Sequence, residues 1–271
     1  MNCLTLNSHS LMGEYASIQV ATLADFIAAE AIDVIALQEV NQTMTAAPLK
    51  SNDRYLAVTR TQLRADNFAV ELIAALAERE LNYYFSWLPC HIGYDRYDEG
   101  VAMLTKTAPI ATKTIHFSET SAYDDYHTRQ AVGVQLANND WFFSIHSGWW
   151  QSDGSEFSYQ WQKLTSALAT LAGRQFLLGD FNNPAHLPKQ GYARILADGW
   201  YDTYNLATHK DDGVTVSGAI DGWRENQAND KRIDFIFCNQ KVDVYEARSV
   251  FNGRNEPVIS DHYGVYVRIK N

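Results

Sequence analysis

Short apolar runs rich in β-branched and aromatic residues recur along the entire chain, and this recurrence restricts the fold more than any other feature. Seven of these runs are clear, at residues 34–37, 101–104, 132–136, 141–145, 176–178, 233–237 and 263–269. Their continuous or alternating apolar patterns are typical of strands in packed sheets. Most of the connections are too short for regular βαβ units. The chain is therefore predicted to form two stacked β-sheets.

Three longer stretches, residues 17–30, 68–81 and 157–171, have the apolar spacing of amphipathic helices. In the first, Val20, Leu23 and Ile27 fall on one helical face. Such helices would cover the outer faces of the sheets. No repeat, low-complexity tract or flexible linker interrupts the 271 residues. We therefore expect a single domain, residues 1–271, with an α+β sandwich fold.

The charge distribution narrows the class of substrate. The net charge is −10, and the densest basic segment is the pair Lys231-Arg232. A protein that clamps long nucleic acid normally presents a basic face, whereas a bound metal ion attracts a single phosphate without one. The composition therefore favours a small phosphorylated substrate over nucleic acid.

The cysteine residues and the hydropathy of the sequence indicate the cellular compartment of the protein. Cys3, Cys90 and Cys238 are odd in number, far apart and in apolar surroundings, which is typical of buried thiols in a reducing compartment. No signal peptide or membrane-spanning stretch is recognisable. We expect a cytoplasmic protein without a membrane partner.

Polar side chains follow several of the apolar runs directly, at positions where a rigid sheet can present them to a shared cleft. These residues are Asn7, Glu39, His146, Asp180, Asn182, Asp261 and His262. Mg²⁺ and Mn²⁺ prefer the oxygen ligands that the carboxylates offer, and histidines can hold or protonate a phosphoryl oxygen. No Gly-x-Ser-x-Gly segment or cysteine in a polar, basic loop suggests a nucleophilic side chain. The pattern predicts a divalent-metal-dependent phosphoesterase in which water attacks directly.

The segments around these residues resemble the signature segments of the endonuclease/exonuclease/phosphatase superfamily. They are Leu37-Gln38-Glu39-Val40, Gly179-Asp180-Phe181-Asn182, Lys231-Arg232-Ile233-Asp234-Phe235-Ile236 and Ser260-Asp261-His262, in the order of that family. With Asn7 and His146 they span nearly the whole chain. The resemblance implies a DNase I-like, four-layered α/β sandwich: two stacked, mostly antiparallel sheets flanked by helices, with the site at one end.

The resemblance also implies roles for individual residues. Glu39 would be the main metal ligand, with Asn7 beside it and Asp261 at the metal or its water shell. Asp180 would orient or deprotonate the attacking water, and Asn182 would hold that water or a phosphate oxygen.

The histidines would act on the phosphoryl group. His262 would contact it, with its other ring nitrogen fixed by Asp234. His146 would stabilise the charge of the transition state or assist the leaving oxygen. Glu99 and Arg129 match positions near the cleft in some members and are candidate substrate-binding residues.

Four further segments are similar to a branch from Gram-positive bacteria that includes maltose 6′-phosphate phosphatases: residues 4–10, 89–94, 98–100 and 220–223. Leu11 departs from the tryptophan that is frequent in that branch. Trp149 and Trp223 lie in segments flanking the predicted site and could stack on a ring-shaped ligand, either a sugar or a base. Trp149 could equally be packed in the core at the base of a loop. A phosphorylated sugar is therefore the favoured substrate.

Several alternatives remain at this stage. The chain could be a nuclease acting at abasic sites or strand ends, or a non-catalytic binding scaffold of the same family. Asp234 could be a structural partner of Arg232. For His9, His91 and His127 a structural role is favoured over a functional one.

Overall fold

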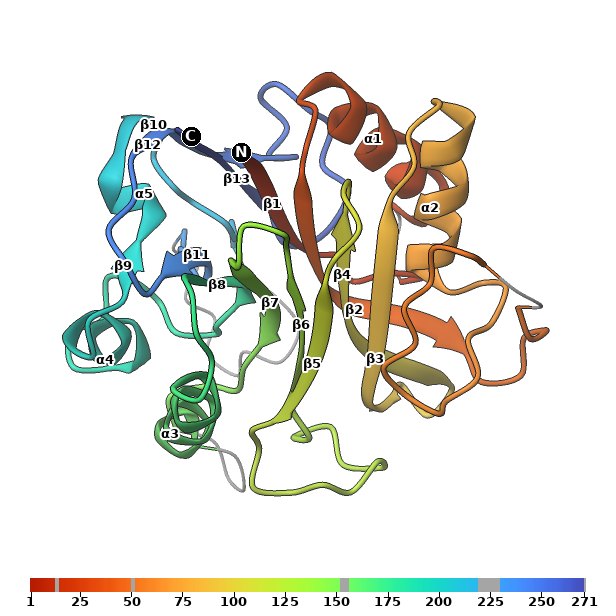
Figure 1. Ribbon diagram of the computed structural model, residues 1–271, viewed down its shortest axis with the longest axis horizontal. Helices are drawn as coiled ribbons and strands as arrows, with labels where there is room; N and C mark the ends of the chain where they lie inside the picture. The colour runs from red at the N-terminus through yellow and green to blue at the C-terminus, as the bar shows by residue number, and fades with distance from the viewer. Residues whose placement is uncertain (13–14, 50–51, 152–155, 219–229, 271) are drawn as a thin grey trace.

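The computed structural model describes residues 1–12, 15–49, 52–151, 156–218 and 230–270, and within them the chain forms two stacked β-sheets (Figure 1). The first sheet has the strand order β10 (Ala207–Lys210), β12 (Val244–Val250), β13 (Gly264–Ile269), β1 (Asn2–Asn7), β2 (Val34–Thr43), β4 (Tyr97–Thr105) and β3 (Tyr84–Gly93). The second has the order β5 (Ala111–His116), β6 (Gln130–Gln135), β7 (Trp141–His146), β8 (Gln175–Asp180), β11 (Asp234–Cys238) and β9 (Tyr201–Asp202).

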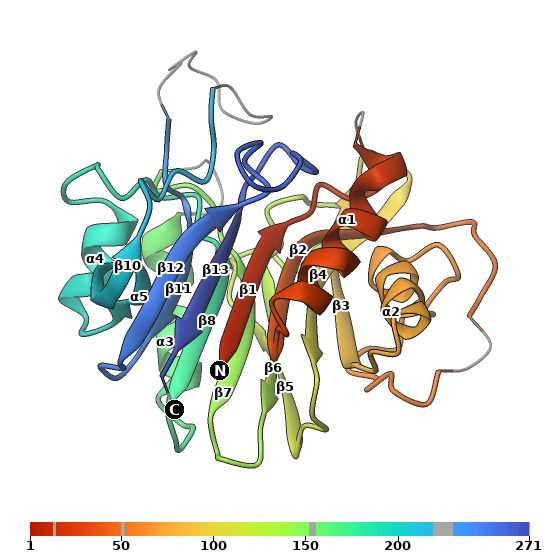
Figure 2. The ribbon, with the colours of Figure 1, turned by 90° about the horizontal axis from the view of Figure 1, so that it is seen from above.

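Helices cover the outer faces of both sheets. They are α1 (Ala16–Ala29), α2 (Phe68–Glu78), α3 (Phe157–Leu168) and α4 (Gly191–Ala197). The short α5 (Thr203–Leu206) instead packs against the apolar layer between the sheets, through Tyr204 and Leu206. Figure 2 shows α1 lying across the outer face of the first sheet, and Figure 1 shows α3 and α4 on the opposite side of the molecule. No helix in the described part of the chain is long and apolar enough to span a membrane.

The alternation of side chains along each strand divides the core into three apolar layers. On β1, Leu4 and Leu6 pack beneath α1 and α2, whereas Cys3 faces the second sheet. Phe142 and Phe176 stack within the layer between the sheets, and Leu177 of β8 faces α3. The result is four layers of secondary structure. The predicted sandwich is therefore confirmed, with mostly antiparallel pairing.

The three predicted helices form with slightly earlier ends, and all three cysteines are free, buried thiols as expected. The apolar-run criterion missed β12 and the four edge strands, β3, β5, β9 and β10. Strand β3 contains Pro89, which lacks a donor for a sheet ladder and is tolerated because β3 is an edge strand. In β12, exposed residues such as Tyr245 interrupt the apolar pattern.

A chain of buried polar groups joins the two sheets immediately beside the predicted metal ligand Glu39. Thr5 Oγ1 donates to Gln38 Oε1 at 3.2 Å, and Gln38 Nε2 donates to Ser144 Oγ of the other sheet at 2.9 Å. Ser144 Oγ in turn donates to the carbonyl oxygen of Leu37 at 2.9 Å. Because Gln38 precedes Glu39, this bridge fixes the backbone from which the Glu39 side chain projects.

The bridge generates a stability prediction. Ser144→Ala removes the acceptor of the buried Gln38 amide and should lower the free energy of unfolding by about 1–3 kcal/mol, because a buried donor is left unsatisfied. Ser166→Ala on α3, where the hydroxyl is exposed, is the matched control and should change it by less than about 0.5 kcal/mol. Chemical denaturation measures both, and equal effects would show that the bridge contributes nothing.

Candidate active site

The ends of strands from both sheets bring the predicted site residues together. Parallel pairing of β7 with β8 sets His146 opposite Asp180, and antiparallel pairing of β8 with β11 sets Asp180 opposite Asp234. Asn7 ends β1 in the facing sheet and reaches across to donate from Nδ2 to Asp180 Oδ2 at 3.2 Å. Residues far apart in sequence thus meet because of strand register.

A β-bulge directs the Glu39 side chain toward Asn7 and Asp180. The register of β2 against β4 shifts between Leu37 and Val40, and Glu39 adopts a left-handed backbone conformation with φ of 50°. Such a conformation is uncommon for a residue with a side chain and often marks a functional position. Glu39 Oε1 accepts a hydrogen bond from Asn7 Nδ2 at 2.8 Å. One amide therefore links the Glu39 and Asp180 carboxylates.

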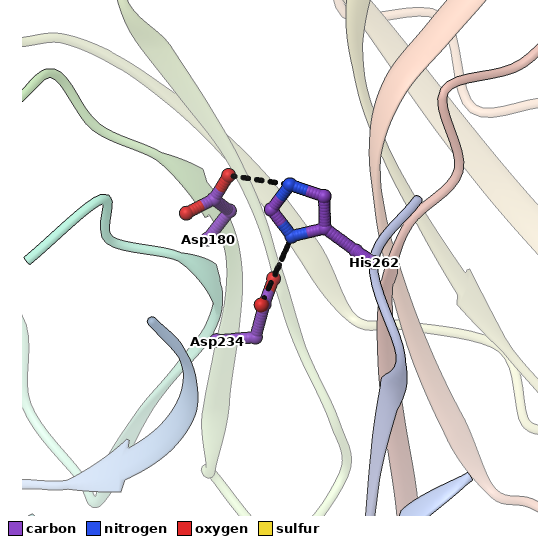
Figure 3. A group of neighbouring side chains, drawn as sticks. All are labelled: Asp180, Asp234 and His262. Atoms are coloured by element: carbon purple, nitrogen blue, oxygen red, sulfur yellow. Dashed lines mark hydrogen bonds and ion pairs between the residues drawn. The ribbon is translucent and has the colours of Figure 1, made fainter. Parts of the chain in front are cut away.

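Asp180, Asp234 and His262 form a buried group within the site (Figure 3). His262 Nδ1 lies 3.0 Å from Asp234 Oδ2, and its Nε2 lies 3.8 Å from Asp180 Oδ2. The imidazole therefore stands between two carboxylates, as its predicted pairing with Asp234 requires. Arg232, the other partner considered for Asp234, instead pairs with Asp202, with 2.5 Å between Nη1 and Oδ2.

Burial and neighbouring charges shift the pKa values of this group. Burial and the negative charge of Asp234 raise the pKa of Asp180 from 3.8 to about 7. Burial alone would lower the pKa of His262, but the charges of Asp234 and Asp180 outweigh it and hold that pKa well above 6.5. The group therefore keeps a proton on the imidazole, while the Asp180 carboxyl titrates near neutral pH.

The backbone around Asp180 adds further constraints. The Asn182 N–H donates to Asp180 Oδ1 at 2.8 Å, and Asn182 Nδ2 donates to the carbonyl oxygen of Ser147 at 3.0 Å. Asn182 has a φ of 51°, which an asparagine tolerates better than most residues. Each Asp180 oxygen is thus oriented by an amide, Oδ1 by Asn182 and Oδ2 by Asn7.

The pKa of His146 is shifted in the direction opposite to that of His262, and Arg129 contributes to this shift. Burial lowers the pKa of His146 well below 6.5, and the positive charge of Arg129 lowers it further, so His146 is neutral at pH 7. His146 Nε2 lies 3.7 Å from Asp180 Oδ2. The Arg129 side chain is buried, and among the described residues its Nε has no hydrogen-bond partner. An unpaired buried guanidinium is an anion-binding group.

Two sets of side chains could hold a divalent cation. Asp180, Asp234 and His262 offer ligand atoms within 4.8 Å of one another. However, the imidazole of this group is already engaged by both carboxylates, and a hard cation such as Mg²⁺ prefers ligand sets made of oxygens.

The Glu39 and Asp180 carboxylates instead converge on the Asn7 amide, where oxygen donors and a partly exposed rim suit a hard cation. Asp261, also partly exposed, stands at the same rim, 4.0 Å from His9 Nδ1. The residues predicted as metal ligands therefore fit Mg²⁺ or Mn²⁺ better than the buried aspartate–histidine group does.

A cavity of about 400 Å³ opens onto these residues. Its walls include most of the predicted site residues: Glu39, Glu99, Arg129, His146, Trp149, Asp180, Asn182, Asp261 and His262. Asn7 and Asp234 are fully buried behind this wall and contact it through their hydrogen bonds. Trp223 lies outside the described residues.

Two histidines for which the sequence favoured a structural role also line the cavity. His9 Nδ1 lies 3.0 Å from Glu39 Oε2, and His91 Nε2 lies 3.1 Å from Glu99 Oε1. The sequence held a signal for His9, because it follows Asn7 by two residues at the same strand end. His127 instead contacts Asp125 in the β5–β6 connection, at 2.7 Å.

Comparisons with known proteins agree with this geometry. The sequence matches the Endonuclease/Exonuclease/phosphatase family over residues 4–262. A comparison with curated proteins finds no match. Among solved structures, an endonuclease/exonuclease/phosphatase family protein from Leptotrichia buccalis is 31% identical, with 100% of both chains covered and a TM-score of 0.88.

Two more distant structures share the fold. A mannosyl-6-phosphatase from Bacteroides thetaiotaomicron is 14% identical, with 100% of both chains covered and a TM-score of 0.67. A 3′ phosphatase from Neisseria, bound to a product DNA hairpin, is 18% identical with the same coverage and a TM-score of 0.61. The family match over nearly all of the sequence and the 31% identical structure agree with the converging strand-end residues, and the chain belongs to the endonuclease/exonuclease/phosphatase family, whose members hydrolyse phosphoesters.

Proposed function

We propose that the chain is a phosphomonoesterase that hydrolyses a phosphorylated sugar such as maltose 6′-phosphate, acting as one catalytic unit over residues 1–271. The observation that carries the proposal is the shared cavity. In it, Asp180 and the protonated His262 stand beside the oxygen-rich group around Glu39. The fold likeness to a mannosyl-6-phosphatase supports a sugar phosphate, as do the branch-like segments of the sequence.

Asp180 is the group best suited to orient and deprotonate the attacking water. A general base works best when its pKa lies near the working pH, and that of Asp180 is raised to about 7. The amides of Asn182 and Asn7 hold its oxygens, so the carboxylate meets the water in a fixed orientation.

Donors for the phosphoryl oxygens surround this carboxylate. His262, kept protonated by Asp234, offers a positively charged Nε2–H. His146 is neutral and can donate a hydrogen bond to the phosphoryl group or to the leaving oxygen. Arg129 contributes a fixed positive charge. Glu39, Asn7 and Asp261 would hold a divalent cation, which when bound supplies Lewis-acid polarisation of a phosphoryl oxygen.

A substrate panel tests the proposal. Maltose 6′-phosphate, other sugar phosphates, a 3′-phosphorylated oligonucleotide and abasic-site DNA would be compared with Mn²⁺ present. We expect the highest kcat/KM on a sugar phosphate. Asp180→Asn should lower that activity by a factor on the order of 10² or more, which also excludes a contaminating phosphatase. Preference for either DNA substrate would favour the nuclease alternative instead.

Metal binding gives a second test that does not depend on turnover. After treatment with EDTA, added Mn²⁺ should raise the melting temperature of the protein, because a ligand that binds only the folded state stabilises it. Glu39→Gln should require roughly 100-fold more Mn²⁺ for the same rise. Glu119→Gln, an exposed acid outside the cavity, should match the wild type. Superimposable curves for all three proteins would remove Glu39 from the metal site.

The shifted pKa values also predict how stability depends on pH in the metal-free protein. In the folded protein Asp180 keeps its proton up to about pH 7, but in the unfolded chain only up to about pH 3.8. Its stabilising contribution to the free energy of unfolding is therefore lost as pH rises from about 3.8 to about 7. The contribution of His262 is lost above pH 6.5, in the same direction.

Asp180 should therefore lower the free energy of unfolding as pH rises from about 5 to about 7, by up to about 1.4 kcal/mol per pH unit, whereas His146, whose pKa is lowered, acts in the opposite direction below pH 6.5. Asp180→Asn removes the Asp180 titration, so the slope of the free energy of unfolding against pH should be more positive in the variant than in the wild type. Denaturation in EDTA at several pH values measures it. An unchanged slope in the variant would mean that Asp180 titrates normally.

A further inference from the structure

One part of the cavity wall is not used by the hydrolytic chemistry described above. It is built by the β3–β4 hairpin and the β5–β6 connection, and we call it the outer wall: His91, Gly93, Tyr94, Asp95, Glu99, Asp124 and Tyr126. We propose that the outer wall is the leaving-group subsite and that it selects an uncharged, hydroxyl-bearing ring, such as a glycosyl unit, over a polyanionic strand. This inference rests on the proposed function.

The two segments of the outer wall are fastened to each other. The Ile92 N–H donates to the carbonyl oxygen of Tyr123 at 2.8 Å, and Tyr123 Oη donates to Asp98 Oδ1 at 2.6 Å. Both segments lie at the same end of the sheets (Figure 1). Because these contacts fix the hairpin against the connection, the wall is formed before a ligand arrives.

His91 and Glu99 form a buried pair at the base of the outer wall. The two residues are cross-strand neighbours, and a register shift between Pro89 and His91 turns the imidazole toward the carboxylate. His91 Nε2 lies 3.1 Å from Glu99 Oε1, and its Nδ1 lies 3.3 Å from the carbonyl oxygen of Thr128. Both imidazole nitrogens are therefore engaged, so His91 holds Glu99 in place.

The second oxygen of Glu99 is the atom best suited to a ligand. Glu99 Oε2 lies against Gly93, where the Cβ of any other residue would collide with it. Gly93 is part of the cavity wall, as is Glu99, and the missing side chain leaves room for this oxygen at the wall. A carboxylate oxygen in that position is a hydrogen-bond acceptor for a sugar hydroxyl.

An independent observation points to a ligand at the inner border of the outer wall. Arg129 is only 6% exposed and lines the cavity, yet among the described residues its buried Nε has no hydrogen-bond partner. Leaving a buried charge unpaired is costly. Arg129 lines the same cavity as His146, the residue assigned to the leaving oxygen, so we place it where the phosphoryl group would meet that oxygen. The ring of the substrate would then extend along the outer wall.

The mouth of the cavity combines aromatic faces with negative charge. Tyr94 and Tyr126 are 51% and 53% exposed at the cavity wall, and rings of this kind stack on the apolar faces of sugars. Asp95 and Asp124 are exposed beside them. These acids accept hydroxyl hydrogen bonds but repel further phosphates, so a neutral ring suits this mouth and a nucleic acid strand does not.

The test compares two substrates in the same enzyme. For Tyr126→Ala, kcat/KM on maltose 6′-phosphate should fall at least 10-fold more than on p-nitrophenyl phosphate, which has no hydroxyl-bearing ring. Tyr126→Phe keeps the aromatic face and should recover most of the loss. Tyr201→Ala is the matched control, since Tyr201 is 40% exposed on β9 and outside the cavity wall. Equal losses on both substrates would overturn the subsite.

Charge selection is tested with a polyanion. Replacing both Asp95 and Asp124 with asparagine should raise kcat/KM on a 3′-phosphorylated oligonucleotide relative to maltose 6′-phosphate by severalfold. The gain should shrink as salt is added, because it comes from removed repulsion. No change in this ratio would show that the two acids do not select the leaving group.

Calorimetric titration with free maltose distinguishes a failure of the proposed function from a failure of the proposed leaving-group subsite. Maltose should bind the wild-type protein, and Tyr126→Ala should weaken binding at least fivefold. If no sugar phosphate is hydrolysed but maltose binds in this way, the proposed function fails and the subsite stands. If sugar phosphates are hydrolysed but maltose does not bind, or binds Tyr126→Ala equally well, the subsite is wrong.

Discussion

Two aspartates, Asp180 and Asp234, lie opposite each other on neighbouring buried strands, and the arrangement of the active site follows from their repulsion. Two buried carboxylates cannot both carry a charge at low free energy unless a positive group stands between them. His262 takes that position and stays protonated as a result. Burial and the same repulsion bring the pKa of Asp180 to about 7. The protonation states of Asp180 and His262 thus depend on the same buried pair of aspartates.

The sandwich makes this arrangement possible because strands from both sheets end at one edge. Asn7 crosses from the first sheet to the Asp180 carboxylate of the second, and the Gln38–Ser144 bridge joins the sheets next to Glu39. A β-bulge then turns Glu39 toward the cavity. None of these contacts supplies much affinity for a phosphate alone. Together they hold donors and acceptors at fixed positions before the substrate binds.

The fold class and the convergence of the strand-end side chains could be predicted from the sequence because strand periodicity and strand-end polar residues are local patterns. The pairing of Asp234 with His262 followed from the family resemblance, and the geometry agrees with it. Apart from Glu99, which the family resemblance placed near the cleft, the outer wall could not be predicted in the same way. It is built from an edge strand that contains Pro89 and from an irregular connection around Asp124. These segments lack a hydrophobic periodicity that would predict their structure. His91 was given a structural role because its partner Glu99 becomes a neighbour only through hairpin register.

The central claim is that side chains from distant parts of the chain converge on one phosphoryl group. A crystal structure of the protein soaked with Mn²⁺ and inorganic phosphate, with anomalous scattering used to locate the manganese, tests it most directly. The account predicts a manganese peak beside Glu39 and a phosphate within hydrogen-bond distance of His146, His262 and Arg129. Manganese bound at Asp234, or phosphate bound only outside the cavity, would contradict it.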